Sequence, residues 1–299
     1  MIFKTTDFIK SYPLRFSIIT VTLNSEKYLV DCIRSVHKQN YKNIEHIIID
    51  GKSTDGTIKI IEDNNEHITH WLSETDRGMY DAINKGLQLA TGDIVGILNS
   101  DDMLASADVI RSIADCFQTH KTDSVYGDLI YVAPENTQRV LRFWKGISYK
   151  HYRFRYGWMP AHPTFFMRRE LIQKYGMYEN HYHTAADYEF MARYLYLHKI
   201  SSTYLEEMIV KMRMGGASNG NWKDRLRANR RDYLAMKKNK IPFAFLVSIL
   251  KPLIKIPQFK GSFRQKTVKK NNDPDYFNSS VSYFPADGKP LSAHAELLQ

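Results

Sequence analysis

Short apolar runs that each end in a cluster of polar residues recur along the first half of the chain. The runs cover residues 16–21, 44–49, 68–72 and 94–98. Segments with apolar residues at helical spacing separate or follow them, over residues 28–39, 79–90 and 107–117. Unbroken apolar strands that alternate with amphipathic helices are typical of a parallel sheet covered on both faces. The sequence therefore predicts an α/β fold with a mostly parallel, doubly wound sheet flanked by helices.

The fourth apolar run ends in two adjacent carboxylates, Asp101 and Asp102, which follow Asn99 and Ser100. Like charges side by side repel each other unless a cation or solvent relieves them. In open α/β sheets, ligands bind outside the carboxyl ends of the strands. The pattern predicts a metal ion and a phosphate group at this point. A solvated loop in which one carboxylate caps the next helix is an open alternative.

Polar residues after the other strands are placed to bind a nucleotide through their side chains. They are Thr22, Asn24, Asp50, Asp76 and Arg77. The first strand is followed by neither a G-x-G-x-x-G motif nor a phosphate-binding P-loop, which disfavours classical dinucleotide-binding folds and P-loop nucleotidases. Lys and Arg outnumber Asp and Glu by 42 to 32, and the resulting net charge of +10 suits a nucleotide, a nucleic acid or an acidic membrane.

The two cysteines, Cys32 and Cys116, both fall in predicted amphipathic helices. We interpret them as reduced core thiols rather than as a disulfide. No signal peptide is visible at the N-terminus, and Lys251 and Lys255 interrupt the longest apolar run. The sequence predicts a cytoplasmic protein, with peripheral attachment to the inner face of the cell membrane as an open alternative.

The second half of the chain has a different pattern. Shorter strands are predicted at residues 124–126, 129–132, 139–144 and 203–212, with a helix from 185 to about 197. Residues 222–240 form a strongly basic predicted helix, which an apolar run over 241–257 follows. Together they predict either attachment to an anionic membrane surface or a helical pair packed on the preceding domain.

Five motifs occur in a fixed order along the chain. They are Val21-Thr22-Leu23-Asn24, Asp50-Gly51-Lys52-Ser53-Thr54-Asp55-Gly56-Thr57, the segment from Asp76-Arg77-Gly78 to Gly86, Ala90-Thr91-Gly92-Asp93 and Asn99-Ser100-Asp101-Asp102. In identity and order this set resembles the family 2 glycosyltransferases, which have a GT-A fold, over about residues 16–218. The resemblance implies an inverting transferase that uses a nucleotide-diphosphate sugar donor and a divalent cation, Mn²⁺ or Mg²⁺.

The resemblance also implies roles for individual residues. Asp101 is the implied metal ligand, and Asp102 supplies a second carboxylate nearby. Asp187 matches the catalytic base of the family, although a helix-cap role is its open alternative. The implied donor-binding set comprises Thr22, Asn24, Asp50, Asp76, Arg77, Asn99 and Ser100.

The chain departs from the family pattern at three positions. Asn99 replaces the first Asp of the family's Asp-x-Asp motif, and Gly51 replaces the second Asp of the early motif. Ala186 replaces the Glu before the base. These changes leave the implied reaction class in place and weaken the assignment of a particular donor sugar.

Two further residues are candidates for contact with the acceptor or the diphosphate. His162 lies in a predicted turn, where packing against Trp158 is an equal alternative. Arg213 follows the last predicted strand and has the chemistry to clamp phosphate oxygens, with an ordinary surface arginine as its alternative.

The predicted organisation is a GT-A catalytic domain over residues 1–220, with a helical C-terminal extension at 221–260 and a polar, flexible tail at 261–299. Within the domain, the nucleotide-sugar half covers about 16–130 and the acceptor half about 131–220. The expected acceptor is a glycan or a lipid-linked molecule in polysaccharide biosynthesis, and no nucleic-acid partner is expected. A sugar-1-phosphate nucleotidyltransferase and a non-catalytic basic protein that binds membranes or nucleic acid are the alternatives. The joint presence of Asp50, Asp101 and Asp187 speaks against the second.

Overall fold

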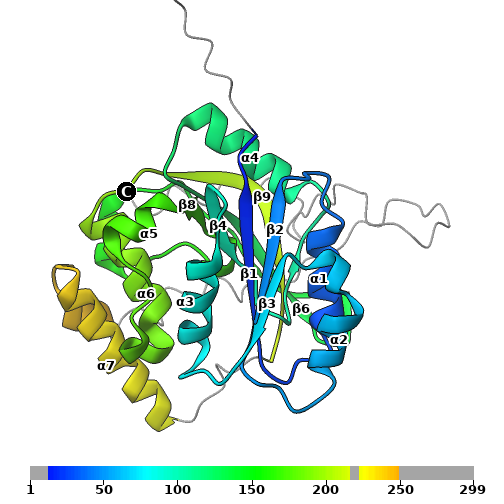
Figure 1. Cartoon of the computed structure of the whole chain (residues 1–299). Helices are drawn as coiled ribbons and strands as arrows, with labels where there is room; N and C mark the ends of the chain where they lie inside the picture. The colour runs from blue at the N-terminus through cyan, green and yellow to red at the C-terminus, as the bar shows by residue number, and fades with distance from the viewer. Residues whose placement is uncertain (1–12, 216–221, 249–299) are drawn as a thin grey trace, which may run out of the picture.

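The computed structural model describes residues 13–215 and 222–248, and a curled sheet forms the centre of this part of the chain (Figure 1). Nine strands are described: β1 (Phe16–Thr22), β2 (Ile44–Asp50), β3 (His70–Ser73), β4 (Ile94–Ile97), β5 (Met103–Leu104), β6 (Ser124–Ala133), β7 (Asn136–Trp144), β8 (Phe166–Arg168) and β9 (Ser202–Arg213). Their order across the sheet is β3-β2-β1-β4-β8-β6-β9-β5, with β7 paired to β6. The predicted α/β architecture is confirmed.

The first four strands are parallel, as predicted. β1 lies between β2 and β4, and Phe16 is in register with both Ile44 and Ile94. β3 extends the set beyond β2, with Ser73 opposite Asp50. Because all four strands run in the same direction, the polar residues at their ends meet at one edge of the sheet.

Helices cover both faces of this parallel part. Ile19 packs in one cluster with Ile83 of α3 (Met79–Leu89), whereas its neighbour Ile18 packs in another with Cys32 of α1 (Leu29–His37) and Ile113 of α4 (Val109–His120). Alternate residues of a strand point to opposite faces, so β1 is buried on both sides. The helix α2 (Thr57–Asp63) joins α1 over β2 in a third cluster. This arrangement is the predicted double winding, and it buries both cysteines as unpaired thiols.

The second half of the sheet is mixed. β8 is antiparallel to β4 and β6, β9 is parallel to β6, and β5 is antiparallel to β9. The predicted strands at 124–126 and 129–132 are one strand, β6, whose register against β9 shifts around Gly127. The sheet therefore continues from the predicted nucleotide-sugar half into the acceptor half.

Shorter helical segments surround the mixed half of the sheet. They are η2 (His151–Tyr156), η3 (His162–Thr164), α5 (Glu170–Tyr175), η4 (Asn180–Ala185), α6 (Ala186–Met191) and η5 (Ala192–Leu197), whereas η1 (Asn65–His67) precedes β3 in the parallel half. The predicted helix from 185 to 197 is present as α6 and the π-helical turn η5. The basic helix α7 (Trp222–Lys238) lies beside α6 (Figure 1). Across the described ranges, no helix has the length and apolar character needed to cross a membrane. The predicted tail at 261–299 lies outside the described residues.

Candidate active site

The ends of β1, β2 and β3 form one polar edge. Thr22 and Ser73 lie on either side of Asp50, at the last positions of the three strands. The carboxylate of Asp50 is fully buried and accepts hydrogen bonds from the Ser53 amide at 2.9 Å, the Ser53 hydroxyl and the Ser73 hydroxyl at 2.6 Å. Asp50 thus holds the loop after β2, and a ligand could reach its carboxylate only if one of these donors gave way.

Asn24 ties the loops after β1 and β2 to each other. Its backbone adopts φ 51°, a left-handed conformation that Asn tolerates better than most residues. Its side-chain oxygen accepts a hydrogen bond from the Thr54 backbone amide at 2.9 Å, and its backbone amide donates to Ser53 Oγ at 2.8 Å. The next residue, Ser25, shares a 2.8 Å hydrogen bond with the hydroxyl of Ser100, which lies beyond β4. The three polar loops therefore behave as one connected surface.

Asp76 and Arg77 form the wall of this edge beyond β3. Asp76 pairs with Lys85 of α3, whereas the Arg77 guanidinium donates to Asp81 at 2.7 Å with 83% of its side chain exposed. The Arg77 guanidinium and backbone amide lower the pKa of the Asp81 carboxyl to about 2. Because the Arg77 side chain is exposed, it can turn from Asp81 toward a ligand phosphate, and Asn180 would still donate to the Asp81 carboxylate.

The two adjacent carboxylates in the turn after β4 differ in their exposure to solvent. Asp101 keeps some exposed surface, whereas Asp102 has none. One oxygen of Asp102 accepts from the Asn99 amide group at 3.0 Å, and the other has no hydrogen-bond partner among the described residues. Burial raises the pKa of both carboxyls, most strongly at Asp102, where the neighbouring Asp101 charge adds to it. Asp101 is thus the carboxylate of this pair that is accessible to a cation.

Arg213 is a buried arginine, so the surface alternative is wrong. It ends β9 and donates to the Asp101 backbone carbonyl at 2.9 Å. Its guanidinium also pairs with Asp31 of α1 at 2.5 Å and lies 4.5 Å from the Tyr28 ring centroid. These contacts fix the turn that carries Asp101 and leave the guanidinium little exposed surface for a ligand.

Asp187 lies in the first turn of α6, and Ala185 occupies the N-cap position. The Asp187 carboxylate accepts from the Tyr188 amide at 2.6 Å and is partly exposed. Its charge raises the pKa of Tyr80 and Tyr178, adding to the larger effect of burial. It also opposes the lowering of the His162 pKa by burial. Tyr178 stacks 5.5 Å from Tyr80 and is hydrogen-bonded to His162, and the Asp187 charge acts on all three side chains. We call Tyr80, His162, Tyr178 and Asp187 the acceptor-side cluster.

Tyr178 is the centre of the acceptor-side cluster. Its hydroxyl and His162 Nε2 are joined by a 2.7 Å hydrogen bond, and its ring stacks 4.0 Å from Phe190. The His162 ring packs edge-on against Tyr178. Sequence reasoning named His162 and Asp187 but missed Tyr178, because an isolated tyrosine carries no signal that distinguishes it from a core aromatic.

Two links connect the acceptor-side cluster to the polar edge. Asn180 donates at 2.9 Å to the same Asp81 oxygen that Arg77 contacts, and so links the segment that holds Arg77 to the segment before α6. His162 belongs to η3, which precedes β8, and β8 is antiparallel to β4. The start of an antiparallel strand lies at the carboxyl end of its partner, so His162 is near the turn that carries Asp101. The predicted donor and acceptor residues thus surround one edge of the sheet.

Few side chains of the described residues are placed to bind a metal ion. No group of three or more His, Cys, Asp or Glu side chains in residues 13–215 and 222–248 is arranged to hold a metal ion. Mg²⁺ and similar hard cations commonly bind one or two carboxylates together with substrate phosphates. Asp101 fits that pattern, with the donor diphosphate providing the remaining oxygens, whereas Asp102 lacks an exposed oxygen.

Comparison with known proteins agrees with this geometry. The model of the family described as glycosyl transferase family 2 matches residues 17–176. A PGL/p-HBAD biosynthesis glycosyltransferase of Mycobacterium bovis is 32% identical over 216 residues, which cover 68% of this chain and 79% of that protein.

Solved structures show the same fold. Staphylococcus aureus TarS (residues 1–349) in complex with UDP-GlcNAc superposes with a TM-score of 0.62 at 19% identity, covering 82% of this chain and 78% of that one. The mannosyltransferase PcManGT of Pyrobaculum calidifontis, in complex with GDP-Man and Mn²⁺, gives a TM-score of 0.56 at 16% identity, covering 84% and 77%. The predicted GT-A fold is confirmed, and the nucleotidyltransferase and non-catalytic alternatives give way to a glycosyltransferase. The chain belongs to glycosyltransferase family 2.

Proposed function

We propose that this glycosyltransferase moves a sugar, with inversion, from a nucleotide-diphosphate sugar to a hydroxyl group of a glycan or lipid-linked acceptor in polysaccharide biosynthesis. The observation that carries the proposal is the placement of an accessible carboxylate, Asp101, and the acceptor-side cluster around one sheet edge. The names of the similar proteins support the donor class, since TarS binds UDP-GlcNAc and PcManGT binds GDP-Man.

The polar edge would bind the donor. We assign the nucleotide to the surface that the loops after β1 and β2 form, where Thr22 Oγ1 is buried without a hydrogen-bond partner among the described residues. The assigned donor-binding residues are Thr22, Asn24, Asp50, Asp76, Arg77, Asn99 and Ser100. Arg77 would exchange Asp81 for a phosphate oxygen.

Asp101 would hold a divalent cation, Mn²⁺ or Mg²⁺, together with the donor diphosphate. Such an ion neutralises charge on the leaving diphosphate. Arg213 contributes by fixing the backbone of Asp101, and Asp102 contributes by holding the Asn99 amide. We therefore assign both as positioning residues rather than as ligands.

Asp187 would act as the base. As the acceptor oxygen bonds to the anomeric carbon, the bond from that carbon to the diphosphate oxygen breaks, and the acceptor proton passes to an Asp187 carboxylate oxygen. The nucleoside diphosphate leaves with the bonding electron pair, and attack from the opposite side inverts the anomeric configuration. His162 and Tyr178 would orient the acceptor hydroxyl toward Asp187.

Metal-dependent nucleotide binding tests the donor half of the proposal. Titration calorimetry with UDP and GDP should show affinity in Mn²⁺ or Mg²⁺ that EDTA abolishes. Asp101→Asn should weaken the metal-dependent affinity by at least about tenfold, because it removes the accessible carboxylate. Asp102→Asn is the matched control and should stay within a few-fold. Equal effects of the two variants would contradict the assignment of Asp101.

A lipid-linked acceptor would bring the enzyme to a membrane, so we include peripheral association with an anionic membrane surface in the proposal. The basic helix α7 and the segment after it are the elements assigned to that contact.

A further inference from the structure

The segment after α7 is apolar on two opposite sides. Residues 244–248 are helical, and Ile241, Ala244 and Val247 are buried against the domain. On the other side, Phe243 is 79% exposed and Phe245 is 68% exposed, with Leu246 at 55%. Packing on the domain explains the first set and not the second. Apart from an edge-on contact between the Phe245 and Tyr233 rings, whose centroids are 6.2 Å apart, these side chains face solvent in the described structure. Large apolar side chains exposed together mark a surface that contacts a partner or a membrane.

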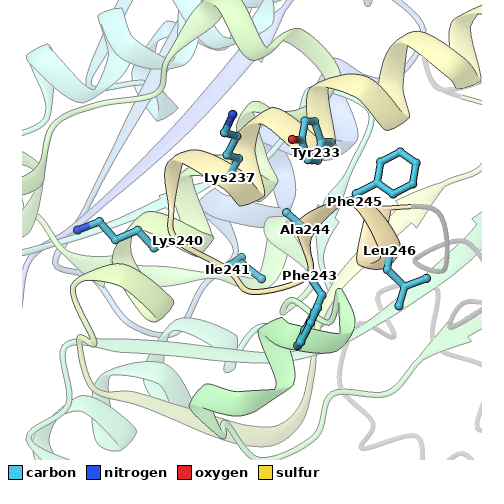
Figure 2. A pocket seen from close by; sticks show the side chains of 8 residues that line it. All are labelled: Tyr233, Lys237, Lys240, Ile241, Phe243, Ala244, Phe245 and Leu246. Atoms are coloured by element: carbon cyan, nitrogen blue, oxygen red, sulfur yellow. The ribbon is translucent and has the colours of Figure 1, made fainter.

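The exposed side chains border a hollow of about 550 Å³ (Figure 2). It lies in the C-terminal extension, and its lining includes no residue of the polar edge that binds the donor in our proposal. The lining residues are Tyr233, Lys237, Lys240, Ile241, Phe243, Ala244, Phe245 and Leu246. This lining combines apolar side chains with two lysines and includes no acidic residue.

The exposed face of α7 continues the same chemistry. Arg227, Arg230, Leu234 and Lys237 are exposed at spacings of three and four residues, which places them on one side of the helix. This stripe runs along the helix into Lys240 and the exposed aromatic residues. The inner side of α7 packs on the domain through Ala235 and Met236, which are fully buried. The extension thus combines a helix packed on the domain with an exposed basic and apolar surface.

We infer that Phe243, Phe245 and Leu246, flanked by Lys237 and Lys240, form the site at which the protein inserts into an anionic lipid surface. This inference rests on the peripheral association in the proposed function and names the side chains responsible. Aromatic and leucine side chains enter the interface of a bilayer, and nearby basic side chains are attracted to its anionic head groups. The +10 net charge of the chain is complementary to such a surface. Protein–protein interfaces are depleted in lysine, so the two lysines beside this apolar surface favour a lipid partner over a protein partner.

The first test measures binding of the full chain to vesicles. Flotation with phosphatidylglycerol and phosphatidylcholine vesicles should recover the protein at low salt, and pure phosphatidylcholine should recover far less. The triple variant Phe243→Ser, Phe245→Ser, Leu246→Ser should reduce the partition coefficient by about tenfold or more. Replacing Leu89 and Leu141, which are also exposed, with Ser is the matched control and should change it by less than about twofold. Triple-variant binding equal to that of the unchanged protein would overturn the inference.

Two pairs of charge-reversal variants test the electrostatic part of the inference. Lys237→Glu with Lys240→Glu should weaken binding to the anionic vesicles about tenfold or more, since both charges lie at the proposed contact. Lys59→Glu with Lys121→Glu makes the same change in net charge on α2 and after α4. Equal loss in both pairs would indicate attraction by net charge alone and would contradict the proposed site.

A labelled variant distinguishes lipid from other occupants. A polarity-sensitive dye on Phe245→Cys is selective, because Cys32 and Cys116 are buried. Its emission should be that of a water-exposed dye in buffer and should shift to the blue with anionic vesicles. Blue emission in buffer that vesicles leave unchanged would mean that a second copy or residues 249–299 cover the surface, and would overturn the inference. Donor hydrolysis without vesicles should be unchanged in the triple variant, so loss of vesicle binding and failure of the catalytic proposal are separate outcomes.

Discussion

Among the five carboxylates assigned to the site, Asp101 and Asp187 are partly exposed, whereas the other three are buried or bound by neighbouring side chains. Asp50 accepts three hydrogen bonds, Asp76 pairs with Lys85, and Asp102 is fully buried. A base and a metal ligand both need an oxygen that a substrate can reach. Accessibility therefore separates Asp101 and Asp187, which a cation or substrate can reach directly, from Asp50 and Asp76, which would have to release a partner to contact the donor. Asp102 is buried and shapes the turn.

Asp187→Asn should separate catalysis from donor binding. The amide keeps the size of the carboxylate but cannot take the acceptor proton, so transfer should fall by about a hundred- to ten-thousand-fold. Nucleotide affinity should stay within a few-fold, because the base acts on the acceptor. Single-turnover transfer and calorimetry on the same variant measure the two effects. Glu170→Gln, the same change in the first turn of α5, is the control for lost helix-dipole stabilisation. Near-normal turnover in folded Asp187→Asn would disprove the base assignment.

The motifs predicted which carboxylates gather at the edge but not what holds them. Arg213 contacts the Asp101 carbonyl across 112 positions of sequence, and Tyr178 meets His162 through the chain reversal between β8 and α6. Such contacts depend on how distant elements pack, and neither residue carries a local pattern that encodes its partner. For this reason the sequence alone leaves Arg213 as a candidate clamp or a surface arginine, whereas the structure shows it buried beside the Asp101 turn.

At the scale of elements, periodicity predicted the parallel strands well and divided β6 wrongly. The apolar runs of β1, β2 and β4 are continuous because those strands are buried on both faces. β6 is interrupted at Gly127-Asp128, where its register against β9 shifts. A Cβ at Gly127 would lie 2.5 Å from Ile209 Cγ1, so the glycine permits the close approach of β9. The polar break in the sequence marks this irregularity within one strand rather than a turn.

Asp128 should make stability depend on pH. Burial raises its pKa from the ordinary value to about 6, although the Gly146 amide, the Tyr204 hydroxyl and Lys145 oppose this and Glu206 adds to it. The folded state therefore binds the proton more tightly than the unfolded state, and stability falls as pH rises from about 4 to about 6. Asp128→Asn, whose side-chain oxygen can still accept from Gly146 and Tyr204, should stabilise the protein by about 1 to 3 kcal/mol at pH 7 and by little near pH 4.

Urea unfolding across this pH range checks the prediction for Asp128. Asp115→Asn, on the exposed face of α4, is the control and should give the same difference at every pH. A pH-independent effect of Asp128→Asn would mean that the carboxyl is not perturbed as described.

At the scale of the whole molecule, Glu189 connects the C-terminal extension to the acceptor side. It is fully buried on α6, two residues after Asp187, and it accepts from Arg193 at 3.0 Å and from Lys238 of α7 at 3.0 Å. Arg193 also donates to three consecutive carbonyls over residues 175–177, directly before Tyr178. The sequence predicts a basic helix over residues 222–240, but it does not indicate that Lys238 pairs with the buried carboxylate of Glu189. Through these contacts, the packing of α7 helps to fix the position of residues 175–178 and therefore of the acceptor-side cluster.

Lys238→Met should therefore loosen both α7 and the acceptor side. The substitution keeps the apolar stem but removes the ion pairs with Glu189 and Glu179, while Arg193 still neutralises Glu189. Because the pair is partly exposed and Glu189 keeps one partner, the expected loss is about 1 to 2 kcal/mol of unfolding free energy. Amide exchange should quicken in α7 and over residues 175–178, and transfer should slow at unchanged nucleotide affinity. Lys237→Met, one position away on the exposed side, makes the same chemical change and should leave stability, exchange and transfer in the absence of vesicles near their original values. If the two variants behaved alike, α7 would be a passive appendage, and the acceptor side would be organised by α6 and its own loops alone.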